Sequence, residues 1–150
     1  MACDVSTKKL EQLKIRARRA GVSNLRIQEI EGTKTAKRNA EKFDGVLVDA
    51  PCSGTGVLRR NSDTKWKLNP EEILRLKGLQ AEILENYCRL VKPGGRLVYA
   101  TCSLLQEENE DQIEKFLKNH TDFRRDGPPL KTRPDLDAED GFYAQRLLKD

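Results

Sequence analysis

Two apolar runs, each followed by a cysteine, constrain the fold of this 150-residue chain more than any other feature. The first predicts a short buried strand over 46–48 that stops at Asp49, and Cys52 follows it after an Ala-Pro turn. The second predicts a strand over 96–101, which Cys102 follows directly. Short apolar runs between turn residues are typical of strands inside a parallel sheet. Ligands bind beyond the carboxyl ends of such strands. We therefore expect both cysteines to lie where chemistry takes place.

Helical and extended patterns alternate along the rest of the chain. A cap at Asp4 or Ser6 begins a predicted helix that ends at Gly21, and Asn69 caps a long helix from Pro70. That helix is expected to end at Pro93-Gly94-Gly95, and a further helix spans 107–119. Short strands are predicted at 22–30, 123 onward and 141–148, and residues 1–4 are expected to be the end of a strand. Loops are predicted at 33–42, where a helical turn is also expected, and at 57–69 and 126–140.

This alternation predicts an α/β fold. The sheet is expected to be Rossmann-like and mostly parallel, with helices on both faces. The length fits one domain, residues 1–150.

The net charge of +4 is unevenly distributed. Residues 1–42 carry a balance of +6, residues 43–102 carry +2 and residues 103–150 carry −4. A basic first third favours a polyanion such as RNA as partner. A solvated helix face explains the same charges equally well.

Cysteine and histidine usage argues against a metal site and against a disulfide scaffold. The four cysteines include no Cys-x-x-Cys pair, and His120 is the only histidine. No apolar run approaches the roughly 20 residues that cross a bilayer, and the N-terminus has no signal-peptide pattern. We therefore expect no metal and no membrane, and a reducing, intracellular, cytoplasmic setting.

Two thiols and a carboxylate suit chemistry on a pyrimidine ring. A thiolate that adds to C6 of cytosine turns C5 into an enamine carbon that can attack an electrophilic methyl group. The C5 proton must then leave and the thiolate must be expelled, with a nearby acid or base assisting. A carboxyl group such as Asp49, held against N3 and the exocyclic amine, would stabilise the charge formed on addition.

The other candidate residues have simpler explanations. Cys88, inside the long helix, and Cys3 are expected to be structural, since a lone cysteine is usually a small buried hydrophobe. Trp66 is expected to be a packed aromatic rather than a base-stacking platform.

With these residues in view, the sequence resembles the RNA cytosine-C5 methyltransferases of the Sun/Fmu family. The segments that carry the resemblance span nearly the whole chain. They are Asp49-Ala-Pro-Cys-Ser-Gly-Thr-Gly56, Asp63-Thr-Lys-Trp66, Lys92-Pro-Gly-Gly95, Tyr99-Ala-Thr-Cys-Ser103 with the following Glu-Glu-Asn, and Asp140-Gly-Phe-Tyr143.

The resemblance implies a role for each candidate residue. Cys102 is the expected nucleophile, Cys52 assists product release and Asp49 contacts the target base. The implied cofactor is S-adenosyl-L-methionine, and the implied partner is RNA, with rRNA favoured over tRNA. The expected cofactor-binding residues are Asp4, which accepts from the ribose hydroxyls, Glu31 near the adenine, Asp49 and Pro51.

One departure from the family pattern is large. The family's glycine-rich cofactor loop, with its strand and helix, should precede Asp4, and the chain is therefore expected to be the C-terminal part of a catalytic domain. Two alternatives remain beside methylation at cytosine C5. One is a non-catalytic fragment that binds RNA or protein, and the other is methylation of an exocyclic amine, which needs no thiol.

Overall fold

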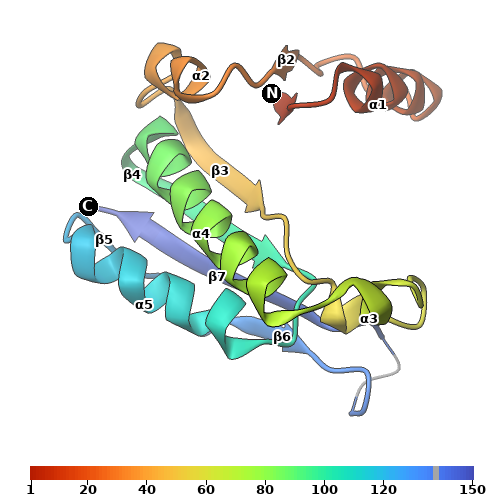
Figure 1. The fold of residues 1–150 in the computed structure, drawn as a ribbon. Coiled ribbons are helices and arrows are strands. Elements are labelled where there is room, and N and C mark those ends of the chain that lie inside the picture. Colours follow the sequence, from red (N-terminus) through yellow and green to blue (C-terminus); the bar gives the residue numbers. More distant parts are fainter. Residues whose placement is uncertain (137–138) are drawn as a thin grey trace. The chain divides into compact units, whose positions relative to one another are not determined.

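The computed structural model describes residues 1–136 and 139–150. The chain divides into two compact units, Met1–Arg38 and Asn39–Asp150 (Figure 1). The expectation that residues 1–150 form one partial methyltransferase domain stays a prediction. Residues 137 and 138 of the predicted 126–140 loop lie outside the described residues.

The first unit is built on two short parallel strands. Its elements are β1 (Ala2–Asp4), α1 (Thr7–Arg19), β2 (Ile27–Glu29) and α2 (Thr33–Arg38). Ser6 is the N-cap of α1, because its side chain accepts a hydrogen bond from the Lys9 amide. Asp4, the other predicted cap, does not cap the helix; its carboxylate accepts a hydrogen bond of 2.8 Å from the Ser6 amide. Strand β2 is shorter than predicted because its partner β1 offers only three residues, which pair up to Asp4 opposite Glu29.

The second unit contains a five-stranded sheet and two long helices. Its elements are β3 (Phe43–Asp49), η1 (Thr55–Val57), α3 (Thr64–Lys67), α4 (Pro70–Tyr87), η2 (Cys88–Leu90), β4 (Val91–Thr101), η3 (Gln106–Glu108), α5 (Glu110–Asn119), β5 (Phe123–Arg125), β6 (Leu130–Thr132) and β7 (Phe142–Lys149).

The sheet is mixed rather than mostly parallel. Its order is β3-β4-β7-β5, with β6 also paired to β7. Strands β3 and β4 are parallel, whereas β4, β5 and β6 all pair with β7 in antiparallel fashion. In the described residues no helix lies between β5, β6 and β7, and strands joined without a helical crossover are typically antiparallel.

Helices α4 and α5 lie against the same face of this sheet (Figure 1). Side chains on that face of the strands, such as Leu97, Tyr99 and Leu147, are fully buried and form one core with Leu84 and Ile113 from the helices. Alternate strand residues point to the other face, where Leu47 is 68% exposed.

The predicted start of the long helix is confirmed and its predicted end is wrong. Asn69 accepts from the Glu72 amide at 2.8 Å, and Pro70 occupies the first turn. The helix ends at Tyr87, and β4 already begins at Val91, so that Pro93-Gly94-Gly95 lies inside the strand. The pairing with β3 is irregular there, which accommodates the extra residues.

Candidate functional site

Strands β3 and β4 bring the two cysteine loops together. Their parallel register runs to Asp49 opposite Ala100, and the Ala50 amide donates to the Ala100 carbonyl at 2.9 Å. The chain therefore leaves both strands at the same edge of the sheet. The Sγ atoms of Cys52 and Cys102 lie 3.3 Å apart in a thiol–thiol hydrogen bond. Both cysteines are half-buried.

This contact separates the acidities of the two thiols. The hydrogen bond from Cys52 is the largest influence on Cys102 and, against the effect of burial, lowers its pKa to about 7. The same hydrogen bond, together with burial, raises the pKa of Cys52. When one of the two thiols ionises, Cys102 is therefore the favoured thiolate, with Cys52 as its S–H donor. The thiolate is the nucleophilic form of cysteine.

Asp49 and Pro51 lie on the segment that leads to Cys52. Asp49 is exposed at the end of β3. Its negative charge acts to raise the pKa of Cys102, which indicates that the carboxylate is near the thiol pair. The Pro51 carbonyl accepts from Gln80 Nε2 at 2.9 Å, so helix α4 holds the turn in place.

Glycine packing closes the loop that follows Cys52. Gly54 has φ +69°, a left-handed conformation. The Gly56 amide donates to the Cys102 carbonyl at 2.9 Å, and the Gly141 amide donates to the Gly56 carbonyl at 2.8 Å. A Cβ atom on Gly56 would lie 2.1 Å from the Gly141 carbonyl oxygen. Only glycine fits this backbone contact.

Asp140 is buried, although the sequence predicted an exposed loop up to this residue. Its side chain is 5% exposed, and its carboxylate forms ion pairs with Arg59, at 2.6 Å, and with Arg60. The Asp140 carbonyl accepts from the Thr132 hydroxyl at 2.6 Å. This cluster fastens the segment after Gly56 to the start of β7.

Asp4 and Glu31 lie in the first unit, at the carboxyl ends of paired strands. The Ile30 amide donates to the Asp4 carbonyl at 3.0 Å, which places the two strand ends side by side. Glu31 forms an ion pair of 2.5 Å with Arg38. The structure therefore brings Asp4 and Glu31 together in one unit, and Asp49, Pro51, Cys52 and Cys102 together in the other.

The remaining cysteines and the tryptophan differ from one another in burial. Cys88 is in the core, as predicted, and burial raises its pKa to about 11. Cys3 is exposed, so the expectation that it packs as a buried hydrophobe is wrong. Trp66 is 80% exposed on α3, with Lys65 Nζ 4.9 Å from its ring centroid. The expectation of a packed aromatic is therefore also wrong, because α3 is a short surface helix.

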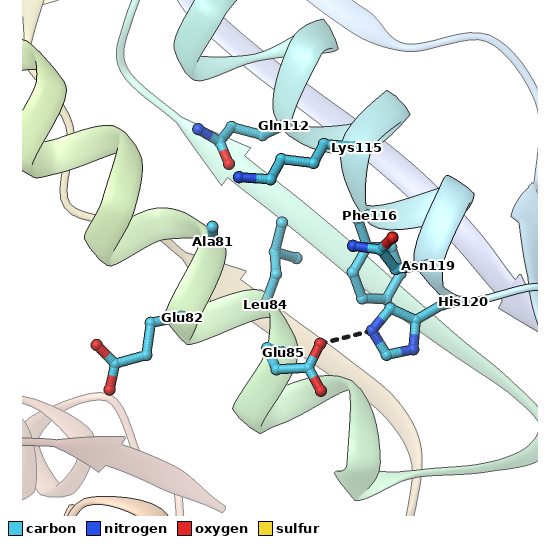
Figure 2. A pocket seen from close by; sticks show the side chains of 9 residues that line it. All are labelled: Ala81, Glu82, Leu84, Glu85, Gln112, Lys115, Phe116, Asn119 and His120. Carbon is cyan, nitrogen blue, oxygen red and sulfur yellow. Dashed lines mark hydrogen bonds and ion pairs between the residues drawn. The ribbon is translucent and has the colours of Figure 1, made fainter.

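A separate hollow lies between α4 and α5 (Figure 2). Its volume is about 270 Å³, and Glu85 and His120 are joined by a 2.7 Å hydrogen bond at one end of it. The hollow contains none of the predicted site residues. In the described part of the chain, no group of three or more His, Cys, Asp or Glu side chains is arranged to hold a metal ion. The described helices include none with the length and apolar character needed to cross a membrane.

Sequence reasoning gave no role to Glu108, Gln80 or Asp140. Glu108 is fully buried beside both cysteine loops, and Gln80 hydrogen-bonds to it from α4. A signal was present for Gln80, since a glutamine on the apolar stripe of a helix requires a polar partner inside the core. Glu108 is part of the Glu-Glu-Asn segment that carries the family resemblance, but its residue pattern did not predict burial, because it stands in a run of acidic residues that is typical of an exposed helix start.

Comparison with solved structures defines the class of this fold. The crystal structure of PH0851 matches 99% of the chain with a TM-score of 0.90 and 33% identity. A methyltransferase homolog protein from Pyrococcus horikoshii matches 99% of it with a TM-score of 0.79 and 30% identity. NSun6 from the same organism, solved with SFG, gives a TM-score of 0.80 at 24% identity and supports the fold alone. The matches cover 36%, 52% and 40% of those chains. The α/β fold is thus that of a partial Rossmann-like methyltransferase domain.

The sequence comparison is more specific. The model of the family described as "16S rRNA methyltransferase RsmB/F" matches residues 1–148, and the chain belongs to this family. Ribosomal RNA small subunit methyltransferase B from Enterobacter sp. (strain 638) is 40% identical over the whole chain, and its counterpart from Salmonella paratyphi A is 39% identical over 99% of it. The chain spans 36% of the length of these curated relatives.

Proposed function

We propose that this chain is part of the catalytic domain of an S-adenosylmethionine-dependent RNA cytosine-C5 methyltransferase that acts on rRNA. The contact between the sulfur atoms of Cys52 and Cys102, 3.3 Å apart at the ends of adjacent parallel strands, carries the proposal. Membership of the RsmB/F family and the names of the curated relatives support rRNA as the substrate.

Cys102 is the nucleophile in this proposal. Its lowered pKa provides thiolate near neutral pH. The thiolate adds to C6 of cytosine, and the electron pair of the C5–C6 double bond moves into the ring toward N3. Carbon C5 then acts as an enamine carbon and forms the new bond to the methyl group, which the bound cofactor would supply from its sulfonium sulfur, leaving as a neutral thioether.

Cys52 completes the reaction. Once Cys102 is bonded to C6, the Cys52 thiol no longer has a thiolate partner and is free to exchange its proton with solvent. In its thiolate form it removes the C5 proton, the C5–C6 double bond forms again, and the Cys102 thiolate leaves C6. Asp49, at the same edge of the sheet, would hold the N3 and exocyclic amine edge of the base and offset the charge formed on addition.

The carboxylates of the first unit fit a cofactor that carries ribose hydroxyls. Asp4 ends β1, and Glu31 lies two residues beyond the end of β2, where carboxylates of such sheets accept from sugar hydroxyls. The Asp4 side chain keeps 31% exposure and uses one oxygen to accept from the Ser6 amide. Asp4 and Glu31 would bind the nucleoside part of S-adenosylmethionine.

The intact parent enzyme tests the two cysteine roles. With target rRNA and labelled cofactor, Cys102→Ala should abolish methyl transfer, and retained full transfer would refute its role as nucleophile. Cys52→Ala should instead accumulate a covalent protein–RNA adduct, seen as a slow band on a denaturing gel. Normal turnover without an adduct would remove Cys52 from the mechanism. Cys88→Ala is the control, because it removes a thiol from the core and not from the candidate site, and it should leave methyl transfer intact.

The 150-residue chain by itself tests the alternative of a non-catalytic binding fragment. Calorimetry measures the binding of S-adenosylmethionine and of RNA to this chain separately. Clear cofactor binding would count against an inert fragment. Salt-dependent RNA binding without cofactor binding would support the alternative.

A further inference from the structure

Glu108 is a buried carboxyl group whose hydrogen bonds converge from three segments of the chain. It lies in η3, is fully buried, and accepts four hydrogen bonds. Its Oε1 atom accepts from the Ser53 amide at 2.9 Å and from Gln80 Nε2 at 3.0 Å. Its Oε2 atom accepts from the hydroxyls of Ser53 and Ser103, both at 2.5 Å. These four donors fill the acceptor positions of a carboxylate.

The donors tie together the two cysteine loops. Ser53 directly follows Cys52, and Ser103 directly follows Cys102. The two serine hydroxyls also lie 3.1 Å apart. Gln80 links the same carboxylate to the Pro51 carbonyl, on the other side of Cys52. One side chain therefore contacts the residues next to both thiols.

The backbone around Glu108 is anchored as well. The Tyr99 hydroxyl donates to the Glu108 carbonyl at 2.7 Å, and Tyr99 is itself fully buried in β4. Asn109 Nδ2 donates to the Ser103 carbonyl at 2.9 Å and Asn109 Oδ1 accepts from the Thr101 hydroxyl at 2.6 Å. The carboxylate is thus presented from a rigid base, which is what a group that sets the position of others requires.

Burying such a carboxyl group works against folding. Desolvation of an ionised carboxylate costs several kcal/mol unless hydrogen bonds replace its water. The four donors here are uncharged, so no ion pair among them offsets this cost. The negative charge of Glu108 also acts to raise the pKa of Cys102, so the carboxylate is not placed there to ionise the nucleophile. A positioning role accounts for both observations.

We propose that Glu108 is a positioning residue that holds the thiols of Cys52 and Cys102 in contact by clamping the loop that follows each of them. Its bearing on catalysis rests on the proposed function, whereas its effect on the two thiols does not. Loss of the clamp should separate the sulfurs. Cys102 then loses the S–H donor that favours its thiolate.

The test uses the 150-residue chain without RNA or cofactor. Alkylation by iodoacetamide is followed as a function of pH, with Cys52 and Cys102 distinguished by peptide mass spectrometry. For Glu108→Ala, the alkylation midpoint of Cys102 should rise, and its rate at pH 7 should fall roughly tenfold or more. Glu107→Gln is the matched control, since the neighbouring Glu107 pairs with Lys77 and not with the serines. It should leave the rate unchanged.

Glu108→Gln separates position from charge. The amide keeps the shape, and the serine hydroxyls can rotate to accept from its NH₂ group. The thiols should stay in contact. The alkylation midpoint of Cys102 should stay the same or move to lower pH, because the negative charge of Glu108, which acts to raise the pKa of Cys102, is gone. Ser103→Ala removes one of the four donors to Glu108, so the alkylation midpoint of Cys102 in this variant should lie between those of the wild type and Glu108→Ala. It also provides a measurement if Glu108→Ala does not fold.

Two results would overturn the proposal. One is an unchanged Cys102 midpoint in folded Glu108→Ala, or in Ser103→Ala if the former does not fold. The other is a folded Glu108→Gln whose Cys102 rate falls as far as that of Glu108→Ala, since charge rather than position would then be responsible. Failure of the proposed function has a different signature, because the intact parent would lack methyl transfer while the thiol measurements keep the expected pattern.

Discussion

At the scale of single residues, the candidate site depends on one shared hydrogen bond. A thiol 3.3 Å from a second sulfur stabilises whichever thiolate forms first, and here the pKa of Cys102 is the one that is lowered. The two cysteines are thus chemically different although each follows a strand in a small-residue turn. This difference matches the proposed division between a nucleophile and a residue that assists release.

The first prediction concerns pH. The Cys102 thiolate should form as pH rises through about 7, so its alkylation rate should climb there and reach a plateau near pH 8 to 9. Cys52→Ala removes the S–H donor and should move the midpoint toward the ordinary cysteine value of 9.0. Peptide-resolved alkylation rates measure both. An unmoved midpoint in Cys52→Ala would contradict the hydrogen bond as the cause.

The second prediction concerns Asp140, which is 5% exposed and paired with Arg59 and Arg60. Asp140→Asn leaves both guanidinium groups with a neutral partner and should lower the free energy of unfolding by about 1–3 kcal/mol. Asp135→Asn is the control, because the Asp135–Arg133 ion pair lies on the surface and should contribute little. Urea denaturation of both variants measures the free energy of unfolding. Equal denaturation midpoints for the two variants would mean that the ion pairs of Asp140 do not stabilise the fold.

At the scale of elements, the sheet and the glycine contacts determine where the loops go. The parallel pairing of β3 and β4 brings two cysteines, fifty residues apart in sequence, to one edge. The backbone contact between Gly56 and Gly141 then fastens the loop after Cys52 to the start of β7.

A pair of glycine substitutions tests this contact. Gly56→Ala places a methyl group 2.1 Å from the Gly141 oxygen and should destabilise the fold by about 1–3 kcal/mol. Gly78→Ala, inside α4 with no atom within 4 Å of the added Cβ, should stabilise it by about 0.5–1 kcal/mol. Thermal unfolding of the two variants gives shifts of opposite sign if the packing is as described. Shifts of the same sign would contradict it.

Sequence patterns predicted those elements whose signals are local. Ser6, Asn69 and Pro70 begin helices as expected, because capping depends on residues close in the chain. Strand β6 and the passage of β4 through Pro93-Gly94-Gly95 were missed, since both depend on pairing with distant strands. The convergence of Cys52 and Cys102 was foreseeable from two parallel strand ends. The buried carboxylates of Glu108 and Asp140 were not, because their donors come from up to 81 residues away.

At the scale of the whole chain, the two units differ in how much they bury. Within Met1–Arg38, the buried side chains are those of Leu10, Thr35 and Ala36. The second unit has a continuous core that includes the fully buried Leu97 and Leu147. The proposed cofactor residues Asp4 and Glu31 therefore lie in the less buried unit.

Hydrogen exchange should show this difference directly. Amides of α1 should exchange through openings of much lower free energy than amides of β4 and β7, because local stability follows the burial of apolar contacts. Mass spectrometry of native-state exchange at fixed pH measures both sets in one sample. Equal protection would mean that the two units unfold as one cooperative body.

The closeness of the two sulfurs has a practical consequence. A disulfide bond is about 2.05 Å long, and the thiols of Cys52 and Cys102 already lie 3.3 Å apart with one favoured as the thiolate. Thiolates are the form that oxidants attack. A mild oxidant would thus join the proposed nucleophile to its partner in one disulfide, and thiol measurements made without a reductant would find less reactive Cys102 than the chain contains.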